Sequence, residues 1–144
     1  MTTMQVLYTA AAHATGDGRD GHVRTSDGTV DLDLAVPKEM GGAGDAANPE
    51  QLFAAGYAAC FHSALRLVAR KARADVSGSV VDAEVGIGPN GDGGFTLTVA
   101  LLVDLPSVPR AAAEELVAHA HQVCPYSNAT RGNIETTLTV RDAA

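Results

Sequence analysis

The sequence contains no tryptophan, only three tyrosines and three phenylalanines, and only two cysteines. Because aromatic residues are so scarce, we expect a core built mainly from Val, Leu and Ala, which the 46% of hydrophobic residues can supply. Cations are scarce as well, since 10 Lys and Arg face 17 Asp and Glu for a net charge of −7. Nucleic-acid binding depends on basic contacts to phosphate, so we expect no nucleic-acid partner.

The first residues, Met1 to Gln5, include neither the basic segment nor the apolar run of a signal peptide. The longest apolar segment is interrupted by Gln, His and Arg, which does not suit insertion into a membrane. We therefore expect a cytoplasmic protein, with residues 1–144 forming a single domain. In that compartment a cysteine pair is more often catalytic, redox-active or metal-bound than a permanent disulfide.

Alternating apolar residues and turn signals predict an α+β fold. Strands with alternating patterns are grouped into hairpins, and helices lie between the groups, which favours antiparallel sheets. Asp27-Gly28 is a strong two-residue hairpin signal between two of these strands. We expect strands at residues 4–10, 22–26, 29–36, 77–88, 95–105 and 133–141, and helices at 48–73 and 107–123.

The predicted long helix has clear end signals and an uncharged middle. Asn48 suits the N-cap and Pro49 the first helical position, while Glu50 complements the positive end of the helix dipole. From Leu52 to Ala64 the only ionisable side chains are those of a tyrosine, a cysteine and a histidine. A helix that is apolar or small on all faces is a buried helix. One sheet covers only one face, so we expect a second copy of the chain to cover another, forming a homodimer.

The two cysteines, Cys60 in this helix and Cys124 at the end of the next, allow three interpretations. First, both are small buried hydrophobic residues, as free cysteines often are. Second, they bind zinc together with His62 and His121. Residues two apart on a helix point in different directions, however, so Cys60 and His62 do not easily bind one ion.

Third, the cysteines form a redox dithiol. One thiolate attacks a peroxide and becomes a sulfenic acid, and the other thiol condenses with it to a disulfide. This chemistry requires a lowered thiol pKa, and hence a nearby cation, which a carboxylate can hold in place. Arg19 on a glycine-rich loop and Glu50 are candidates for that ion pair. The residues alone leave all three interpretations open.

Two long motifs carry a resemblance to a known family. Residues 48–61 read Asn-Pro-Glu-Gln-Leu-Phe-Ala-Ala-Gly-Tyr-Ala-Ala-Cys-Phe, and residues 121–133 read His-Gln-Val-Cys-Pro-Tyr-Ser-Asn-Ala-Thr-Arg-Gly-Asn. Together with the Gly-Gly-Ala-Gly stretch at 41–44 and the order of elements, they resemble the organic hydroperoxide resistance proteins of the Ohr/OsmC family. The resemblance covers essentially the whole chain.

The resemblance implies an OsmC-like fold, with antiparallel sheets packed around a long central helix in an intertwined homodimer. It also implies a thiol peroxidase that reduces organic hydroperoxides, including those of fatty acids, in the response to oxidative stress. A lipoylated protein or dihydrolipoamide would be the reductant, and no cofactor or metal is expected. By resemblance, Cys60 is the peroxidatic cysteine, Cys124 is the resolving cysteine of the redox-active disulfide, and Glu50 with Arg19 activates Cys60.

Two features qualify this assignment. The family's arginine often follows a Thr-Gly-Gly stretch, whereas here Thr-Gly-Asp-Gly precedes Arg19. Glu50 and Cys60 are ten residues apart, which is a rise of about 15 Å along one unbroken helix. Either the helix breaks near Gly56, where a break costs least, or the Glu50 that serves a given Cys60 belongs to the partner's helix. We favour the second option, which makes the site composite.

A preference for organic over inorganic peroxides would follow from an apolar substrate pocket. The residues proposed for its lining are Leu52, Phe53, Phe61 and Tyr126, although plain core packing explains them equally well. The alternatives are a peroxidase of the OsmC branch or a non-enzymatic dithiol protein that senses redox state or binds zinc.

Overall fold

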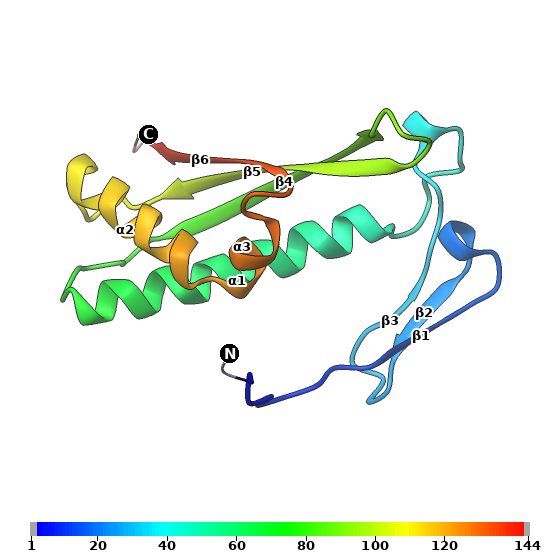
Figure 1. Ribbon diagram of the computed structural model, residues 1–144, viewed down its shortest axis with the longest axis horizontal. Coiled ribbons are helices and arrows are strands. Elements are labelled where there is room, and N and C mark those ends of the chain that lie inside the picture. Colours follow the sequence, from blue (N-terminus) through cyan, green and yellow to red (C-terminus); the bar gives the residue numbers. More distant parts are fainter. Residues whose placement is uncertain (1–2, 143–144) are drawn as a thin grey trace. The chain divides into compact units, whose positions relative to one another are not determined.

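The computed structural model describes residues 3–142, and the chain divides into two compact units. The N-terminal unit comprises residues up to Pro49, and the C-terminal unit begins at Glu50 (Figure 1). The α+β class predicted from the sequence is confirmed, because each unit contains a three-stranded sheet and the C-terminal unit also contains the long helix.

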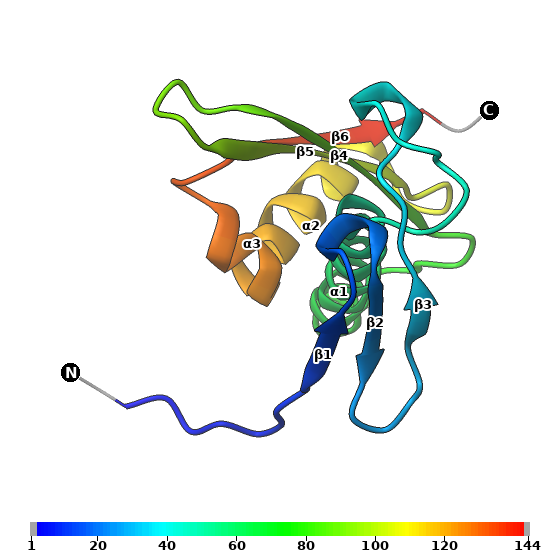
Figure 2. The same ribbon diagram turned by 90° about the vertical axis from the view of Figure 1, so that its right-hand side faces the viewer.

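The N-terminal unit is an antiparallel sheet of short strands, drawn in blue in Figures 1 and 2. Its strands, in the spatial order β1-β2-β3, are β1 (Ala12–Thr15), β2 (His22–Thr25) and β3 (Asp31–Asp33). The predicted Asp27-Gly28 turn joins β2 to β3, and Gly28 has a φ of 75° that favours glycine. The Asp27 carboxylate accepts hydrogen bonds from the Thr25 hydroxyl (2.8 Å) and the Thr29 amide (3.0 Å). A hairpin at Asp27-Gly28 is therefore confirmed, but the predicted two-residue loop is wrong, because the Thr25 N–H donates to the Val30 carbonyl and residues 26–29 form the loop. The strand β3 is also shorter than the predicted strand at 29–36.

The prediction of a first strand at residues 4–10 is wrong. Residues 3–11 pair with no strand of the described chain, and β1 lies between the strands predicted at 4–10 and 22–26. The apolar side chains of this N-terminal arm lie in solvent, with exposed fractions of 78% for Met4, 92% for Leu7 and 80% for Tyr8. An apolar pattern makes a strand only where a neighbouring strand supplies hydrogen bonds. Within this chain, Ala12–Thr15 has that neighbour in β2.

The C-terminal unit contains the second sheet and the helices. Its elements are α1 (Pro49–Lys71), β4 (Val80–Pro89), β5 (Phe95–Asp104), α2 (Arg110–Val123), α3 (Pro125–Thr130) and β6 (Glu135–Arg141). Figures 1 and 2 show α1 and α2 on the same face of the β4-β5-β6 sheet. The predicted β4–β5 hairpin is confirmed, and its register pairs Val81 with Val103, Ala83 with Leu101, Val85 with Val99 and Ile87 with Leu97.

Two features of this unit differ from the predictions. β6 pairs with β5 in parallel, so the sheet is not entirely antiparallel. The chain crosses between these strands through α2 and α3, and parallel neighbours require a long crossover of this kind. The short helix α3 was also not predicted. Its polar residues lack a wide apolar stripe, and the signal that was available was Pro125 at its first position.

The helix α1 is continuous from Pro49 to Lys71, so the predicted alternative of a break near Gly56 is wrong. Its length and composition alone would suit a membrane span. One of its faces is instead buried in the core of the unit, together with strand residues such as Leu101 and Val103. The helix residues on that face are Tyr57, Phe61, Ala64, Leu65, Val68 and Ala69. Other positions of α1 are exposed in the single chain, so the burial expected on all its faces requires further cover.

His22, just after the loop that contains Arg19, is held between two carboxylates of the neighbouring strand. Its Nε2 lies 2.5 Å from Asp31 Oδ1 and its Nδ1 lies 2.7 Å from Asp33 Oδ1. The hydrogen bond to Asp33, followed by that to Asp31, raises the pKa of His22 above its ordinary value of 6.5. A protonated His22 therefore joins β2 to β3 through two charge-assisted hydrogen bonds.

We predict that the N-terminal sheet is more stable when His22 is protonated than when it is neutral. Because its pKa is raised by folding, the stabilising effect is complete below the unfolded pKa of about 6.5 and disappears as the pH rises through the raised value. An NMR titration of the His22 ring should give a pKa above 6.5, and Asp33→Asn should lower it. Asp27→Asn, in the turn of the same hairpin, is the matched control and should leave it unchanged. A His22 pKa at or below 6.5 in the unmodified protein would contradict the prediction.

Candidate functional site

The two cysteines lie side by side in the C-terminal unit. Cys60 lies in the middle of α1, and Cys124 is the residue between α2 and α3. Cys124 has the extended conformation (φ −63°, ψ 123°) that a following proline favours, so the predicted end of α2 at this residue is confirmed. The two sulfur atoms are 3.7 Å apart, with both thiols free. Cys60 is partly exposed, whereas Cys124 is completely buried.

A buried hydrogen-bond network fixes Cys124 beside Cys60. The hydroxyl of Tyr57, one turn before Cys60, lies 2.8 Å from Ser127 Oγ and 3.0 Å from Thr130 Oγ1. All three side chains are buried, so losing one partner would leave buried polar atoms unsatisfied. The network therefore holds α3 against α1. It was not predicted, because a tyrosine on an apolar helix and two hydroxyl residues three apart do not reveal each other in the sequence.

The environment of Cys60 does not favour a thiolate within one chain. Burial is the main cause that raises the pKa of the Cys60 thiol, and the neighbouring thiol of Cys124 raises it further. A hydrogen bond from the backbone N–H of Tyr126 acts in the opposite direction, but burial dominates. A reactive thiolate at this position therefore needs a cation beyond these contacts.

Arg19 lies in the N-terminal unit, on a tightly built loop. It is the middle residue of the 3₁₀ turn η1 (Gly18–Asp20), and its side chain is half-buried. The Asp20 carboxylate accepts a hydrogen bond from the Val36 amide (2.9 Å), which ties the turn to the chain beyond β3. A Cβ atom at Gly21 would lie 2.2 Å from the Thr15 carbonyl oxygen, so only glycine fits there. The loop thus presents Arg19 in a defined conformation.

Glu50 lies in the first turn of α1, as predicted, on the same helix as Cys60. Because α1 is unbroken, the ten residues between them correspond to about 15 Å along the helix axis. This distance exceeds the reach of a glutamate and an arginine head group together. The structure brings Cys60 and Cys124 together but separates Glu50 from the Cys60 of its own chain.

The predicted pocket residues have different environments. Phe61 is fully buried in the core, and Leu52 is half-buried. Phe53, Tyr57 and Tyr126 form an aromatic cluster, in which the ring centre of Phe53 lies 6.1 Å from that of Tyr57 and 5.9 Å from that of Tyr126. Tyr126 packs closely over Gly56, where a Cβ atom would lie only 2.6 Å from its hydroxyl oxygen. This explains why a glycine is tolerated inside α1.

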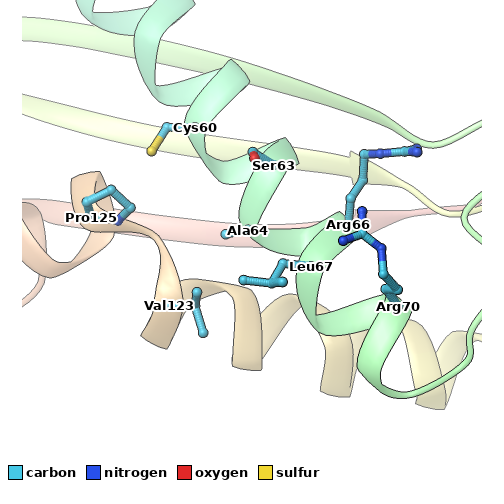
Figure 3. Close-up of a pocket in the computed structure, with 8 residues that line it drawn as sticks. All are labelled: Cys60, Ser63, Ala64, Arg66, Leu67, Arg70, Val123 and Pro125. Atoms are coloured by element: carbon cyan, nitrogen blue, oxygen red, sulfur yellow. The ribbon is translucent and has the colours of Figure 1, made fainter. Parts of the chain in front are cut away.

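An open cleft of about 440 Å³ lies beside Cys60, within the C-terminal unit. Figure 3 shows Cys60 and Pro125 at one end and Arg66 and Arg70 at the other. The cleft is lined by Cys60, Ser63, Ala64, Arg66, Leu67, Arg70, Val123 and Pro125. The sequence alone did not assign these two arginines to the site. Their spacing of six and ten residues from Cys60 along one helix was the available signal.

The zinc-binding interpretation is not supported by the described residues. Among residues 3–142, no three His, Cys, Asp or Glu side chains form a group that could hold a metal ion. His62 instead lies 2.9 Å from the Ser79 hydroxyl through its Nε2. His121 lies one turn before Cys124, and burial lowers the pKa of its ring.

Comparisons with known proteins agree with this geometry. Residues 42–139 match the family described as OsmC-like protein. The chain is 54% identical to the organic hydroperoxide resistance protein of Xanthomonas axonopodis pv. citri, over 94% of this chain and 96% of that protein. A thiocyanate-bound structure of an organic hydroperoxide resistance protein from Elizabethkingia anophelis has a TM-score of 0.92 and 52% identity, covering 97% of this chain and 100% of that one.

A third similar protein is the putative organic hydroperoxide resistance protein of Vibrio cholerae, whose structure has captopril bound in one of its active sites. It has a TM-score of 0.90 and 51% identity, over 96% of this chain and 95% of that one. The family match covers more than half of the chain, and the similarity to these relatives extends over nearly all of it. The chain therefore belongs to the Ohr/OsmC family, among its organic hydroperoxide resistance proteins.

Proposed function

We propose that this protein is a thiol-dependent peroxidase that reduces organic hydroperoxides, including those of fatty acids, to alcohols. The observation that carries the proposal is the 3.7 Å separation between the partly exposed sulfur of Cys60 and the buried sulfur of Cys124. The partly exposed thiol of Cys60 is accessible to a substrate, and the buried thiol of Cys124 lies within reach of the Cys60 sulfenic acid that the reaction forms. Membership of a family named for organic hydroperoxide resistance supports the same chemistry.

The reaction begins with the Cys60 thiolate. It attacks the terminal oxygen of the hydroperoxide, an S–O bond forms, the O–O bond breaks, and the alkoxide leaves as an alcohol after taking a proton. The thiol of Cys124 then attacks the Cys60 sulfur. The S–O bond breaks, hydroxide leaves as water with the proton of Cys124, and a disulfide forms. The sulfurs approach from 3.7 Å to a bonding distance of about 2.05 Å.

A dithiol reductant completes the cycle. Its first thiolate attacks the Cys60–Cys124 disulfide and forms a mixed disulfide, and its second thiol displaces the protein cysteine. The reductant becomes a cyclic disulfide, and both protein thiols are restored. A lipoyl group, either on a lipoylated protein or as dihydrolipoamide, is the reductant that we propose, and the cytoplasm is the proposed location.

The active site is shared between two chains of a homodimer. Cys60 needs a cation, because burial raises its pKa, and its own Glu50 lies about 15 Å away along α1. In an antiparallel pair of α1 helices, the Glu50 of one chain would approach the Cys60 of the other. Its carboxylate would hold the Arg19 guanidinium beside that thiol through an ion pair. Two observations support a second copy: α1 has exposed faces, and the N-terminal arm leaves Met4, Leu7 and Tyr8 in solvent.

The Cys60–Cys124 pair gives the first test. Cys60→Ser should abolish turnover of cumene hydroperoxide with dihydrolipoamide, because it removes the nucleophile. Cys124→Ser should still allow one oxidation per chain, but its sulfenic acid has no resolving thiol and should proceed to sulfinic acid with excess peroxide. Mass spectrometry would detect the two added oxygens on Cys60. Steady-state turnover should fall at least a hundredfold in both variants.

Rapid loss of both thiols on adding an organic hydroperoxide, without any turnover, would instead favour the alternative of a non-enzymatic redox sensor. Turnover that persists in Cys60→Ser would contradict the proposed mechanism. A peroxidase of the OsmC branch would use similar chemistry, and comparing fatty-acid hydroperoxides with hydrogen peroxide tests the proposed preference for organic substrates.

Mixed dimers test the shared site. Glu50→Ala and Cys60→Ser homodimers should each be nearly inactive. After the two chains are mixed and exchanged, half of the molecules should be heterodimers with one site that has both residues intact. Activity should therefore recover to about a quarter of the unmodified level. Recovery requires that Glu50 and Cys60 of one site come from different chains.

The control is a mixture of Glu50→Ala,Cys60→Ser double-variant chains with unmodified chains, in which each heterodimer has the two changes on one chain. A shared site loses both active sites in that heterodimer, whereas a site within one chain keeps one. Activity that never reappears in the first mixture, with subunit exchange verified by mass spectrometry, would contradict the shared site.

A further inference from the structure

The cleft beside Cys60 has two chemically different ends (Figure 3). At one end lie the Cys60 thiol and the apolar ring of Pro125, and at the other lie Arg66 and Arg70. Between them the lining is mainly aliphatic, with Leu67 from α1 and Val123 from α2. The cleft therefore suits a ligand with three parts: a group that reacts with the Cys60 thiol, an apolar chain along the aliphatic middle, and an anion at the arginines.

The two arginines have no anionic partner in the described chain. No carboxylate of residues 3–142 lies within 4.0 Å of either guanidinium, although the protein carries an excess of seven acidic charges. Arg66 and Arg70 are four residues apart on one helix, an arrangement in which like charges repel. Arg70 in the last turn also benefits from the helix dipole, but Arg66 lies a turn earlier and gains less. An anion between them would relieve the repulsion.

The spacing along α1 sets the length of the ligand. Arg66 and Arg70 follow Cys60 by six and ten residues, which correspond to about 9 and 15 Å along the axis. Each bond of an extended chain advances about 1.2 Å, a third of the span of one peptide residue. Roughly 7 to 12 bonds therefore separate a group at the Cys60 thiol from an anion at the arginines.

We propose that Arg66 and Arg70 form a carboxylate-recognition subsite, which selects hydroperoxides carrying a carboxylate roughly 7 to 12 bonds from the peroxide group. The inference rests on the proposed peroxidase function of Cys60 and adds specificity to it. The guanidinium groups bind the carboxylate through charge-assisted hydrogen bonds, and the aliphatic middle of the cleft takes up the chain. The peroxide group is thereby directed toward Cys60. Arg66 and Arg70 determine which hydroperoxide is preferred and take no part in breaking the O–O bond.

The kinetic test compares a fatty-acid hydroperoxide with its methyl ester, which removes only the negative charge. The variant is Arg66→Gln,Arg70→Gln, and the matched control is Lys71→Gln, which removes a neighbouring cation that does not line the cleft. In the double variant, kcat/KM for the free acid should fall about tenfold or more, mainly through KM. Values for the ester and for cumene hydroperoxide should change less than twofold, and Lys71→Gln should behave as the unmodified protein.

Chain geometry gives a second arm. Positional isomers of one fatty-acid hydroperoxide place the peroxide at different distances from the carboxylate. Isomers inside the window of roughly 7 to 12 bonds should be preferred over those outside it, and the double variant should lose the preference. An equal loss for acid and ester, or no loss for either, would overturn the proposal.

The carboxylate that binds the arginines could also belong to the reductant. A further experiment distinguishes a carboxylate on the reductant from one on the hydroperoxide. Dihydrolipoate carries a carboxylate that dihydrolipoamide lacks, so reduction of the disulfide is measured with each at fixed cumene hydroperoxide. The proposal expects the double variant to affect the two reductants equally. A selective loss for dihydrolipoate, with unchanged use of fatty-acid hydroperoxides, would assign the arginines to the reductant and overturn it.

Direct binding distinguishes failure of this subsite from failure of the peroxidase proposal. Calorimetry with laurate, which contains no peroxide, should give binding about tenfold weaker in the double variant than in Lys71→Gln, whether or not the protein is a peroxidase. Methyl laurate should show no such difference. Equal laurate binding by both variants would overturn the subsite, while absence of turnover with every hydroperoxide would overturn only the peroxidase.

Discussion

The cost of ionising a half-buried thiol is the constraint on which the proposed site depends. Burial raises the pKa of Cys60, and the second thiol at 3.7 Å raises it further, because a negative sulfur loses solvation in these surroundings. The single backbone N–H from Tyr126 offsets only part of this cost. A site of this kind is stable as a dithiol and reactive only when a cation is delivered to it. In the proposed shared site a second chain meets this need, since the Glu50 of the same helix lies about 15 Å away.

The long helix α1 therefore has several roles. Its buried face forms the core of the C-terminal unit, where Tyr57 also anchors α3 through Ser127 and Thr130. These hydrogen bonds hold Cys124 beside Cys60, and they depend on the backbone turn that Pro125 imposes. Further along the same helix, Arg66 and Arg70 line the cleft beside Cys60. A rigid helix is well suited to this, because its rise per residue fixes the distances between a nucleophile, its activator and a substrate's charged end.

The sequence predicted what local patterns control. The start of α1 at Pro49, a hairpin at Asp27-Gly28 and the pairing of the strands predicted at 77–88 and 95–105 follow from helix-start signals, turn residues and alternation, and the structure confirms them. The first strand was misplaced because residues 4–10 have a strand pattern but no partner in their own chain. The parallel β6 and the short α3 were missed because they depend on a long crossover and on a buried network rather than on local preference. Cys60 and Cys124 were assigned as the redox pair through a family resemblance, whereas the short distance between them can be seen only in the folded structure.

The measurement that most directly tests the activation of Cys60 by a cation is its pKa, obtained from the pH dependence of its alkylation by iodoacetamide. It is best made in Cys124→Ser chains, so that only one thiol reacts, and compared with Cys124→Ser chains that also carry Arg19→Gln. If Arg19 stabilises the thiolate, the Cys60 pKa should lie below the ordinary value of about 8.5 and should rise above it in the Arg19→Gln protein. A Cys60 pKa above that value in both proteins, or the same lowered value in both, would contradict activation of Cys60 by Arg19.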